Sequence, residues 1–297
     1  MGFVYKFSFK WGTKGPGEGQ FDLPVDVAVD SAANVYVVDS VNNRIQKFTS
    51  TGIFITKWGS EGSGDAQFKR PTGIAVDLSG NVYVTDMLNN RVQKFRSDGS
   101  FIRAWGTFGS GNGQFNIPGG IDIDSNLDVY VTDVWNHRIQ KFTHEGTFIR
   151  AWGTIGSGDG QFKNPLRVAV DFSGNVYVSD NGNSRIQKFR IDGSFIRTWG
   201  TFGSGDGQFN NLYGVALDSS GNAYVVDLVN TRIQKFTNEG AFITKWGTFG
   251  SGDGQFSNPL CIAIKSGEVS FLQERVYVSD ACNNRIQVFR PELISDT

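Results

Sequence analysis

The sequence predicts an all-β, six-bladed β-propeller, and three observations lead to this fold class. Six tryptophans recur every 47 residues, each repeat holds four short segments rich in β-branched and aromatic residues, and the N-terminus supplies the one segment that the last repeat lacks. The tryptophans are Trp11, Trp58, Trp105, Trp152, Trp199 and Trp246. A period of this length marks a repeat architecture, in which each unit buries its apolar face against its neighbours. Four strands repeated six times fit the blades of a propeller.

The second repeat shows the four expected strands, which we call a to d. Residues 73–77 form a short apolar run that ends in the turn cluster 78–81. Residues 82–86 and 91–95 then form strands b and c, and residues 101–105 form strand d. Gly, Asn, Asp and Ser separate these segments, as they do in a β-meander. A Gly-rich connection then leads to the next repeat.

The two ends of the chain predict how the ring closes. The sixth repeat has no fourth strand after residues 285–289, whereas residues 7–11 occupy the register of residues 54–58 in the first repeat. We therefore expect the N-terminal strand to complete the last blade and to remove two exposed sheet edges. The expected organisation is one domain over residues 1–297, with an insertion near residues 266–275 of the last repeat. The insertion lengthens the a–b hairpin and holds Glu268, Phe271, Leu272 and Gln273.

The repeat resembles the NHL repeat, a match carried in the second unit by residues 73–77, 81–86 and 89–95. This resemblance covers nearly the whole chain and implies a six-bladed propeller. It implies little about chemistry, because a fold does not fix a function. Members of the family include RNA- and protein-binding domains, extracellular sensor domains of receptor kinases, and a zinc-dependent amidating lyase. Streptogramin lyases and calcium-dependent lactonases are similar at a greater distance.

Charge and hydropathy exclude several classes of protein. The formal net charge is −1, so no overall field favours nucleic acid or an acidic membrane surface. No apolar run approaches the roughly 20 residues that span a bilayer, and the N-terminus is expected to be a strand, not a secretion signal. We expect a soluble monomer. The two cysteines, Cys261 and Cys282, are expected to be exposed free thiols, because disulfide geometry is demanding.

A repeated set of acidic, amide and basic residues has a structural interpretation. Each strand b ends in Asp, and Asn and Arg follow three and five residues later, as in Asp39, Asn42 and Arg44. An asymmetric substrate needs one site, whereas this set occurs six times. We expect ion pairs and Asx turns that hold the b–c hairpins.

Residues for metal or nucleophilic chemistry are scarce. The only histidines are His137 and His144, and a lyase-type zinc site needs several convergent histidines. The spacing of Asp122, Asp124 and Asp128 resembles a calcium loop but lacks its Gly and Glu positions, so we expect an ordinary turn. We assign no catalytic residue, no metal ligand and no cofactor.

Candidate binding residues are those that break the repeat. Most of them lie at the start of strand a or in the b–c loops, which a propeller places on one face around the channel mouth. Neutral drift is the alternative, but apolar side chains gathered in exposed loops often bind a partner. Asp122 stands where five repeats carry Ala; it either accepts internal hydrogen bonds or meets a ligand. The candidates are Asp26, Met87, Leu88, Asp122, Trp135, His137, Arg167, Tyr213 and Leu228.

The favoured function is a non-enzymatic binding or interaction module that uses the channel-mouth face. Its partner is expected to be an unknown protein, peptide or small ligand. A lyase- or lactonase-like enzyme on the same face is the alternative, and it is favoured by His137 and Asp122, which are each unique to blade 3. RNA binding ranks third, because it needs a basic face and the balanced net charge does not indicate one. A mainly structural role is also open.

Overall fold

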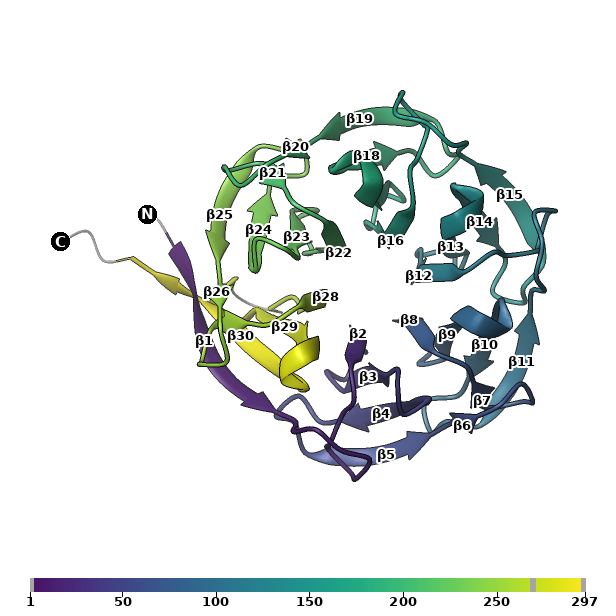
Figure 1. Cartoon of the computed structure of the whole chain (residues 1–297), viewed down its shortest axis with the longest axis horizontal. Helices are drawn as coiled ribbons and strands as arrows, with labels where there is room; N and C mark the ends of the chain where they lie inside the picture. The colour runs from purple at the N-terminus through teal and green to yellow at the C-terminus, as the bar shows by residue number, and fades with distance from the viewer. Residues whose placement is uncertain (1–2, 268–270, 295–297) are drawn as a thin grey trace.

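The chain forms a closed ring of six four-stranded antiparallel sheets around a central axis (Figure 1). This computed structural model describes residues 3–267 and 271–294. The innermost strand of each sheet is strand a of its repeat, and the outermost is strand d. The predicted six-bladed β-propeller is therefore confirmed.

The blades follow one another in chain order around the ring. Blade 1 consists of β2 (Pro24–Val29), β3 (Val35–Asp39), β4 (Arg44–Phe48) and β5 (Phe54–Trp58), and blade 2 of β8 (Pro71–Val76), β9 (Val82–Asp86), β10 (Arg91–Phe95) and β11 (Phe101–Trp105). Blade 3 consists of β12 (Pro118–Ile123), β13 (Val129–Asp133), β14 (Arg138–Phe142) and β15 (Phe148–Trp152), and blade 4 of β16 (Pro165–Val170), β17 (Val176–Asp180), β18 (Arg185–Phe189) and β19 (Phe195–Trp199). Blade 5 consists of β22 (Leu212–Leu217), β23 (Ala223–Asp227), β24 (Arg232–Phe236) and β25 (Phe242–Trp246), and blade 6 of β28 (Pro259–Lys265), β29 (Arg275–Asp280), β30 (Arg285–Leu293) and β1 (Phe3–Trp11).

The connections between these strands contain two-residue strands and single 3-10 turns. Two-residue parallel pairs brace three connectors: β6 (Ser60–Glu61) with β7 (Gln67–Phe68), β20 (Thr201–Phe202) with β21 (Gln208–Phe209), and β26 (Thr248–Phe249) with β27 (Gln255–Phe256). Single 3-10 turns form η1 (Met87–Asn89), η2 (Val134–Asn136), η3 (Asn181–Asn183) and η5 (Ala281–Asn283) in b–c loops, and η4 (Phe271–Gln273) in the insertion. Glu268 of the insertion lies outside the described residues, as do residues 269 and 270. In the described part of the chain, no helix is long and apolar enough to cross a membrane.

The strands agree with the expected ones except at the start and end of strand a and in the closing pair β1 and β30, which are longer than predicted. In blade 2, β8 begins at Pro71 and ends at Val76, whereas residues 73–77 were predicted. Asp77 leaves the strand because its carboxylate accepts hydrogen bonds from the backbone N–H groups of Ser79 and Asn81. An Asx turn of this kind competes with strand pairing.

The N-terminal strand closes the ring, as predicted. β1 pairs antiparallel with β30, with Phe7 opposite Phe289 and Trp11 opposite Ile286. Tyr5 secures this junction: its ring stacks on Trp246 at 4.3 Å, and its hydroxyl donates to Glu274 at 2.6 Å. β1 begins at Phe3 and is thus longer than the predicted strand of residues 7–11.

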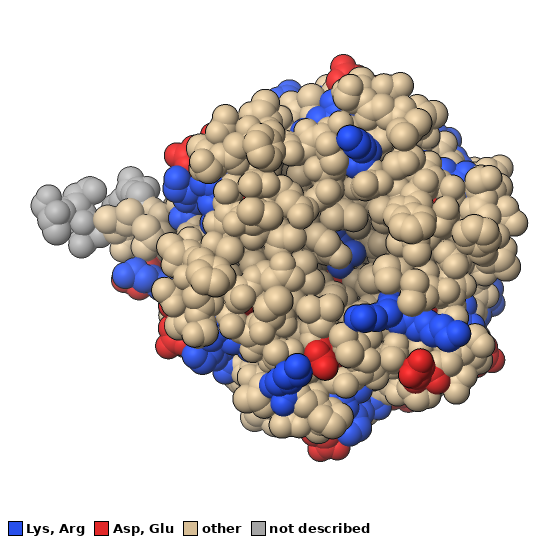
Figure 2. Space-filling model, viewed as in Figure 1, with Lys and Arg blue, Asp and Glu red and all other residues tan. Residues whose placement is uncertain are grey.

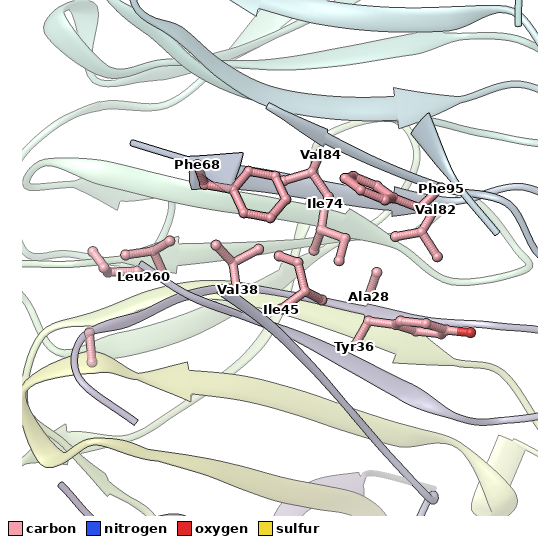
Figure 3. Close-up of a cluster of buried hydrophobic side chains, with 12 residues drawn as sticks. Ala28, Tyr36, Val38, Ile45, Phe68, Ile74, Val82, Val84, Phe95 and Leu260 are labelled. Carbon is pink, nitrogen blue, oxygen red and sulfur yellow. The ribbon is translucent and has the colours of Figure 1, made fainter. Parts of the chain in front are cut away.

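The hydrophobic core lies in the six seams between neighbouring blades. The described residues form six buried clusters, one for each seam. Figure 3 shows the seam between blades 1 and 2, where Val38 and Ile45 face Ile74 and Phe95. Aromatic side chains bury about 150–250 Å² each, so the repeated Phe, Tyr and Trp residues dominate this packing.

The two faces of the ring differ in what they carry. Strand a runs away from the connectors, so the b–c loops and the connectors share one face, which we call the mouth face. The a–b and c–d turns share the other, which we call the opposite face. The insertion in blade 6 joins β28 to β29 and therefore lies at the opposite face.

Candidate functional site

The six repeated Asp, Asn and Arg residues form clamps that hold each connector onto its b–c loop. In blade 3, the Arg138 Nε lies 2.7 Å from the Asp133 carboxylate, and the Arg138 guanidinium also donates to the carbonyls of Gly111 and Gln114. Asn136 donates to the carbonyl of Gly109. The Arg–Asp distance is 2.7 or 2.8 Å in all six blades. The structural interpretation of these residues holds, and the clamps also position the connectors.

The b–c loops present apolar tips on the mouth face. The central residue of each loop is exposed in all six blades, and outside blade 4, where it is Gly182, it is Val41, Leu88, Trp135, Val229 or Cys282. Trp135 stands out, with 62% of its surface exposed. Two other candidates, Met87 in blade 2 and Leu228 in blade 5, are partly buried at the first position of their loops. The structure therefore gathers four of the candidate residues at loop tips on one face.

His137 has a backbone role that sequence reasoning did not foresee. It adopts a left-handed conformation with φ of 54°, and the equivalent residues Asn43, Asn90, Ser184, Thr231 and Asn284 do the same. Its Nδ1 accepts a hydrogen bond from the Asn164 backbone N–H at 3.2 Å. In the preceding blade, the Asn90 side chain accepts the corresponding bond from Ile117. His137 thus supplies the same hydrogen-bond acceptor between neighbouring blades as the asparagine at this position in the preceding blade.

Asp26 and Arg167 lie inside the channel and not on its rim. They occupy the same position of strand a in blades 1 and 4, which stand on opposite sides of the ring. The Arg167 guanidinium crosses the channel and donates to the Thr72 carbonyl at 2.8 Å, and its Nε lies 3.9 Å from the Asp26 carboxylate. Both side chains are buried, and the Tyr213 ring lies 4.9 Å from the guanidinium. We call Asp26, Arg167, Tyr213 and Cys261 the hub.

Glycine makes room for the hub. Blades 2, 3 and 5 carry Gly73, Gly120 and Gly214 at the position of Asp26 and Arg167. A Cβ atom on Gly120 would lie 2.8 Å from the Arg167 Cα and 2.9 Å from its Cδ. A side chain at this position would therefore displace the arginine from the channel. Burial raises the pKa of Asp26, and the charge of Arg167 and backbone N–H donors oppose that shift.

The two cysteines differ in exposure. Both are free thiols, but Cys261 is buried in the hub beside Asp26 and Arg167, whereas Cys282 is exposed at the tip of its b–c loop. The expectation of two exposed thiols is thus wrong for Cys261, because its position in strand a faces the inside of the ring. Burial raises the pKa of the Cys261 thiol, so it stays protonated.

Asp122 lies deeper in the channel than the other candidates. It is four residues along β12 from Pro118, or about 13 Å at ~3.3 Å per residue, and is therefore well separated from His137 at the mouth face. Its carboxylate accepts hydrogen bonds from the Ile123 and Val170 backbone N–H groups at 2.9 and 2.7 Å. The neighbouring Asp124 accepts from Tyr130 and Asp128 in an ordinary a–b turn, as expected.

The connectors carry a set of exposed apolar residues that sequence reasoning missed. Four consecutive connectors expose Phe108, Ile155, Phe202 and Phe249, with 67–75% of each side chain accessible. The other two connectors hold Lys14 and Glu61 at the same position. A bulky apolar residue directly before a Gly-Ser-Gly turn was the available signal, since solvated turns rarely favour one. Each lies beside a clamp and hence on the mouth face.

Exposed apolar side chains at loop tips and connector tips recur over blades 3 to 6, and we call this set the apolar arc. The arc consists of Trp135, Val229, Phe108, Ile155, Phe202 and Phe249. Figure 2 looks onto this face, where most of the surface is uncharged and a basic group lies in the central hollow. Lys and Arg are scattered among Asp and Glu in this view, without forming one continuous basic patch.

Within the part of the chain that the structure describes, no group of three or more His, Cys, Asp or Glu residues is arranged to hold a metal ion. The acidic residues of the clamps are engaged by arginine, and His137 is engaged by the backbone. The clamp aspartates and His137 on the mouth face therefore already have partners, whereas its exposed apolar side chains do not depend on such groups to contact a ligand.

Comparison with protein families identifies the repeat. Four segments, residues 21–48, 68–95, 115–142 and 162–189, match the family model of the NHL repeat. Each match runs from the Gln-Phe connector through strand c of its blade. The resemblance stated from the sequence is confirmed. A search of curated protein sequences finds no match.

Solved structures with a similar fold have varied roles. A catalytically inactive virginiamycin B lyase from Staphylococcus aureus, solved with quinupristin, shares 15% identity at a TM-score of 0.64, covering 98% of this chain and all of that one. A gluconolactonase from Xanthomonas campestris shares 12% identity at a TM-score of 0.66, covering 93% and 88%. A chain of the nidogen/laminin complex shares 18% identity at a TM-score of 0.62, covering 82% and 93%. At such low identity these structures show the shared fold alone.

Proposed function

We propose that this NHL-repeat protein is a non-enzymatic binding module whose mouth face holds a protein or peptide partner. The apolar arc carries this proposal, because four consecutive connectors place large apolar side chains in solvent at the same position. Scattered apolar residues are ordinary on a protein surface, whereas gathered ones mark interaction sites. The arc is rimmed by the polar positions Lys14 and Glu61, which would limit the contact to blades 3 to 6.

The residue types on this face suit a protein partner. Trp, Tyr and Arg are enriched among interface hot spots, and truncation of a hot-spot side chain costs about 2 kcal/mol or more of binding free energy. Trp135 is the most suitable anchor, because it combines the largest side chain with high exposure at a loop tip. Arg167 and Tyr213 pair with each other in the channel below this face, and Arg167 is buried, so they would not anchor the partner.

The exposed thiol of Cys282 offers a direct test, because it lies at a loop tip of the mouth face while Cys261 is buried. A photo-crosslinker attached to Cys282 should form a discrete adduct in an extract of the producing organism. The matched control is a Cys282→Ser, Ser31→Cys variant, which moves the crosslinker to an a–b turn on the opposite face. The control should give no such adduct.

Two variants within the arc then decide whether the adduct reports this surface. Phe202→Lys installs the residue type that another connector carries, and Trp135→Ala truncates the proposed anchor. Each should weaken the affinity for the identified partner at least tenfold and change the free energy of unfolding by less than about 0.5 kcal/mol. Equal crosslinking from both faces, or unchanged affinity in both variants, would exclude the mouth face as the binding site.

An enzyme is the second candidate, because the lyase and the gluconolactonase have the same fold. Lyase or lactonase chemistry on the mouth face would have to use the hub or His137. Activity that survives both Arg167→Met and His137→Asn would contradict such a mechanism. RNA binding on the mouth face would need a continuous basic surface, whereas Lys and Arg are interspersed with Asp and Glu on the face that Figure 2 shows.

A further inference from the structure

Three breaks in the repeat meet in one sector of the opposite face. Asp122 in blade 3 replaces the alanine of the other five blades. Leu78 in blade 2 and Phe172 in blade 4 replace a serine that stands at this turn position in the other four blades. Leu78 and Phe172 expose 68% and 81% of their surfaces. Because blades 2 and 4 flank blade 3, all three changes border the same part of the channel.

Two adjacent cavities border these residues: one is the central channel, lined by strand a of all six blades, and the other lies between blades 2 and 4. The first lies between the hub and the opposite face and has a volume of about 180 Å³. Its wall includes Asp122 and the small side chains of Ala75, Ala169 and Ala216, together with hub residues and larger apolar side chains. The second is a notch of about 120 Å³ lined by Leu78, Ile123 and Phe172 and by Asp77, Asp124 and Asp171. These three carboxylates accept backbone hydrogen bonds within their own a–b turns. The two cavities share Val76 and Val170 in their walls, so the notch adjoins the channel beside Asp122.

The backbone adds polar groups to the channel wall. Strand a pairs with strand b on one side only, so half of its N–H and C=O groups point toward the axis. The bonds from Ile123 and Val170 to Asp122 show that these residues belong to the inward-pointing set. Because the C=O of a strand residue points to the same side as its N–H, the Ile123 and Val170 carbonyls also face the channel near Asp122.

Asp122 differs from Asp26 in its electrostatic surroundings. Each carboxylate bridges two neighbouring blades through backbone N–H donors. Asp26 also faces Arg167, whereas no basic side chain pairs with Asp122 in residues 3–267 and 271–294. Burial raises the pKa of Asp122 to about 7, and the charges of Asp26 and Asp124 add to the rise. On the hub side of the cavity, Arg167 is already engaged by Asp26 and the Thr72 carbonyl, and Cys261 is a neutral thiol.

We propose that this sector binds a small amphipathic ammonium ion, with its charged head at Asp122 and its apolar body in the notch beside Leu78 and Phe172. A primary ammonium group has three N–H donors, which match the Asp122 carboxylate together with the inward-facing carbonyls of Ile123 and Val170. A charge-assisted hydrogen bond to a partly buried carboxylate is stronger than a neutral one. An anion would be repelled by Asp122, and Arg167 on the hub side of the cavity is already engaged by Asp26 and the Thr72 carbonyl. Engineered apolar cavities of about 150 Å³ hold benzene, so an aryl or short alkyl amine fits the available space.

Calorimetric titration with phenethylammonium tests this assignment, with 2-phenylethanol and 3-phenylpropionate as neutral and anionic ligands of similar shape. The ammonium should bind at pH 8.5, where Asp122 is ionised, and at least tenfold more weakly at pH 5.5. At that pH the ligand remains charged while the carboxyl takes up a proton. The alcohol and the carboxylate should bind at least tenfold more weakly than the ammonium at pH 8.5.

Variants that restore the repeat separate binding from folding. Asp122→Ala installs the residue of five other blades, and the double variant Leu78→Ser, Phe172→Ser installs the serine of four others, so both should fold as the wild type does. The first should weaken phenethylammonium at least tenfold. The second should weaken phenethylammonium at least threefold and leave methylammonium unchanged, because methylammonium does not reach the notch.

A mouth-face variant keeps this site distinct from the proposed partner surface. Trp135→Ala should leave phenethylammonium affinity unchanged, whatever its effect on a protein partner. The ammonium site is overturned if the wild-type protein does not bind phenethylammonium at pH 8.5, if the alcohol binds as tightly, or if Asp122→Ala binds the amine unchanged.

Discussion

The clamps and the hub both pair an aspartate with an arginine, but they do so in opposite ways. In each clamp the two residues are five positions apart, lie 2.7 or 2.8 Å from each other, and recur in all six blades. In the hub Asp26 and Arg167 come from opposite blades, lie 3.9 Å apart, and occur once. Every clamp can form within one repeat and its connector. The hub pair exists only when the ring has closed.

This difference distinguishes residues that build the repeated fold from residues that make one blade unlike another. The clamp is the same local solution used six times, so it explains how the connectors are held and not what the protein recognises. The hub, the apolar arc and Asp122 break the repeat and give the ring distinguishable sides. The following experiments test whether the two kinds of region are as independent as the geometry indicates.

Removal of residues 1–10 should have the largest effect, because it deletes most of β1 and leaves β30 with an unpaired edge. It also removes Tyr5, which packs on Trp246 in the seam between blades 5 and 6. We expect a lower melting temperature and concentration-dependent association, measured by calorimetry and sedimentation. A truncated protein that stays monomeric and melts like the wild type would refute closure by this strand.

Arg167→Met should be the most destabilising single change in the hub. It leaves the Asp26 carboxylate buried without its cation, a change that typically costs about 3–5 kcal/mol of unfolding free energy. Urea denaturation measures this loss. The double variant Asp26→Asn, Arg167→Met should recover part of it, since the uncompensated charge is gone. Equal losses in the single and double variants would show that packing, not charge, dominates the hub.

Arg138→Ala, the matched change in a clamp, should cost less, about 2 kcal/mol, because Asp133 keeps its bonds from Asn116 and Asn136. Its effect should be local. Hydrogen exchange should lose protection in the connector at Gly111 and Gln114, with little change at the hub. Loss of protection spread evenly over the ring would mean that clamps and hub act as one unit.

Asp122→Ala should change the pH dependence of stability. The folded carboxyl has a pKa near 7 against an ordinary value near 4, so the folded state binds more protons than the unfolded state between these pH values. Wild-type stability relative to the variant should therefore fall as pH rises from about 4 to 7 and then level off. We expect a change of about 1 kcal/mol, since one pKa unit corresponds to about 1.4 kcal/mol and cavity solvent screens much of the shift. Denaturation of both proteins at pH 4 and 8 measures it, and parallel curves would contradict the raised pKa.

His137→Asn should have the smallest effect, within about 0.5 kcal/mol of the wild-type unfolding free energy. Asparagine tolerates the left-handed conformation and supplies the same acceptor in three other blades. His137→Ala is the sharper control, because it keeps neither property. If the asparagine variant is as destabilised as the alanine variant, the imidazole has a role beyond the one that its contacts show.

Local signals in the sequence were sufficient for the repeated parts of the fold. The turn clusters, the alternation within strands and the position of Trp in strand d are properties of a few neighbouring residues, and the structure places them as expected in every blade. Closure by β1 was also readable, because the missing strand of one end was present at the other. Among the candidate binding residues, Trp135 and Leu88 were placed correctly at exposed loop tips, because loop position follows from the hairpin itself.

The remaining candidates show where sequence reasoning ended. Asp26 and Arg167 were expected at the rim, yet they meet inside the channel across 141 positions of chain. His137 was a candidate because it is unique to blade 3, but in the structure its Nδ1 accepts a hydrogen bond from the Asn164 backbone N–H of the neighbouring blade. The exposure of Phe108 and Phe202 was not predicted, because it depends on how each connector folds onto its clamp.

The sequence alone determined six blades, their strand order and the closing strand, because each of these follows from hydrophobic patterns and turns within about 50 residues. Only the tertiary structure decided which side chains face the channel, which face the solvent and which neutralise one another. That decision depends on contacts between different blades. A repeat period specifies each blade separately, whereas the ring brings residues from distant blades to one axis, where a single substitution meets groups from several repeats.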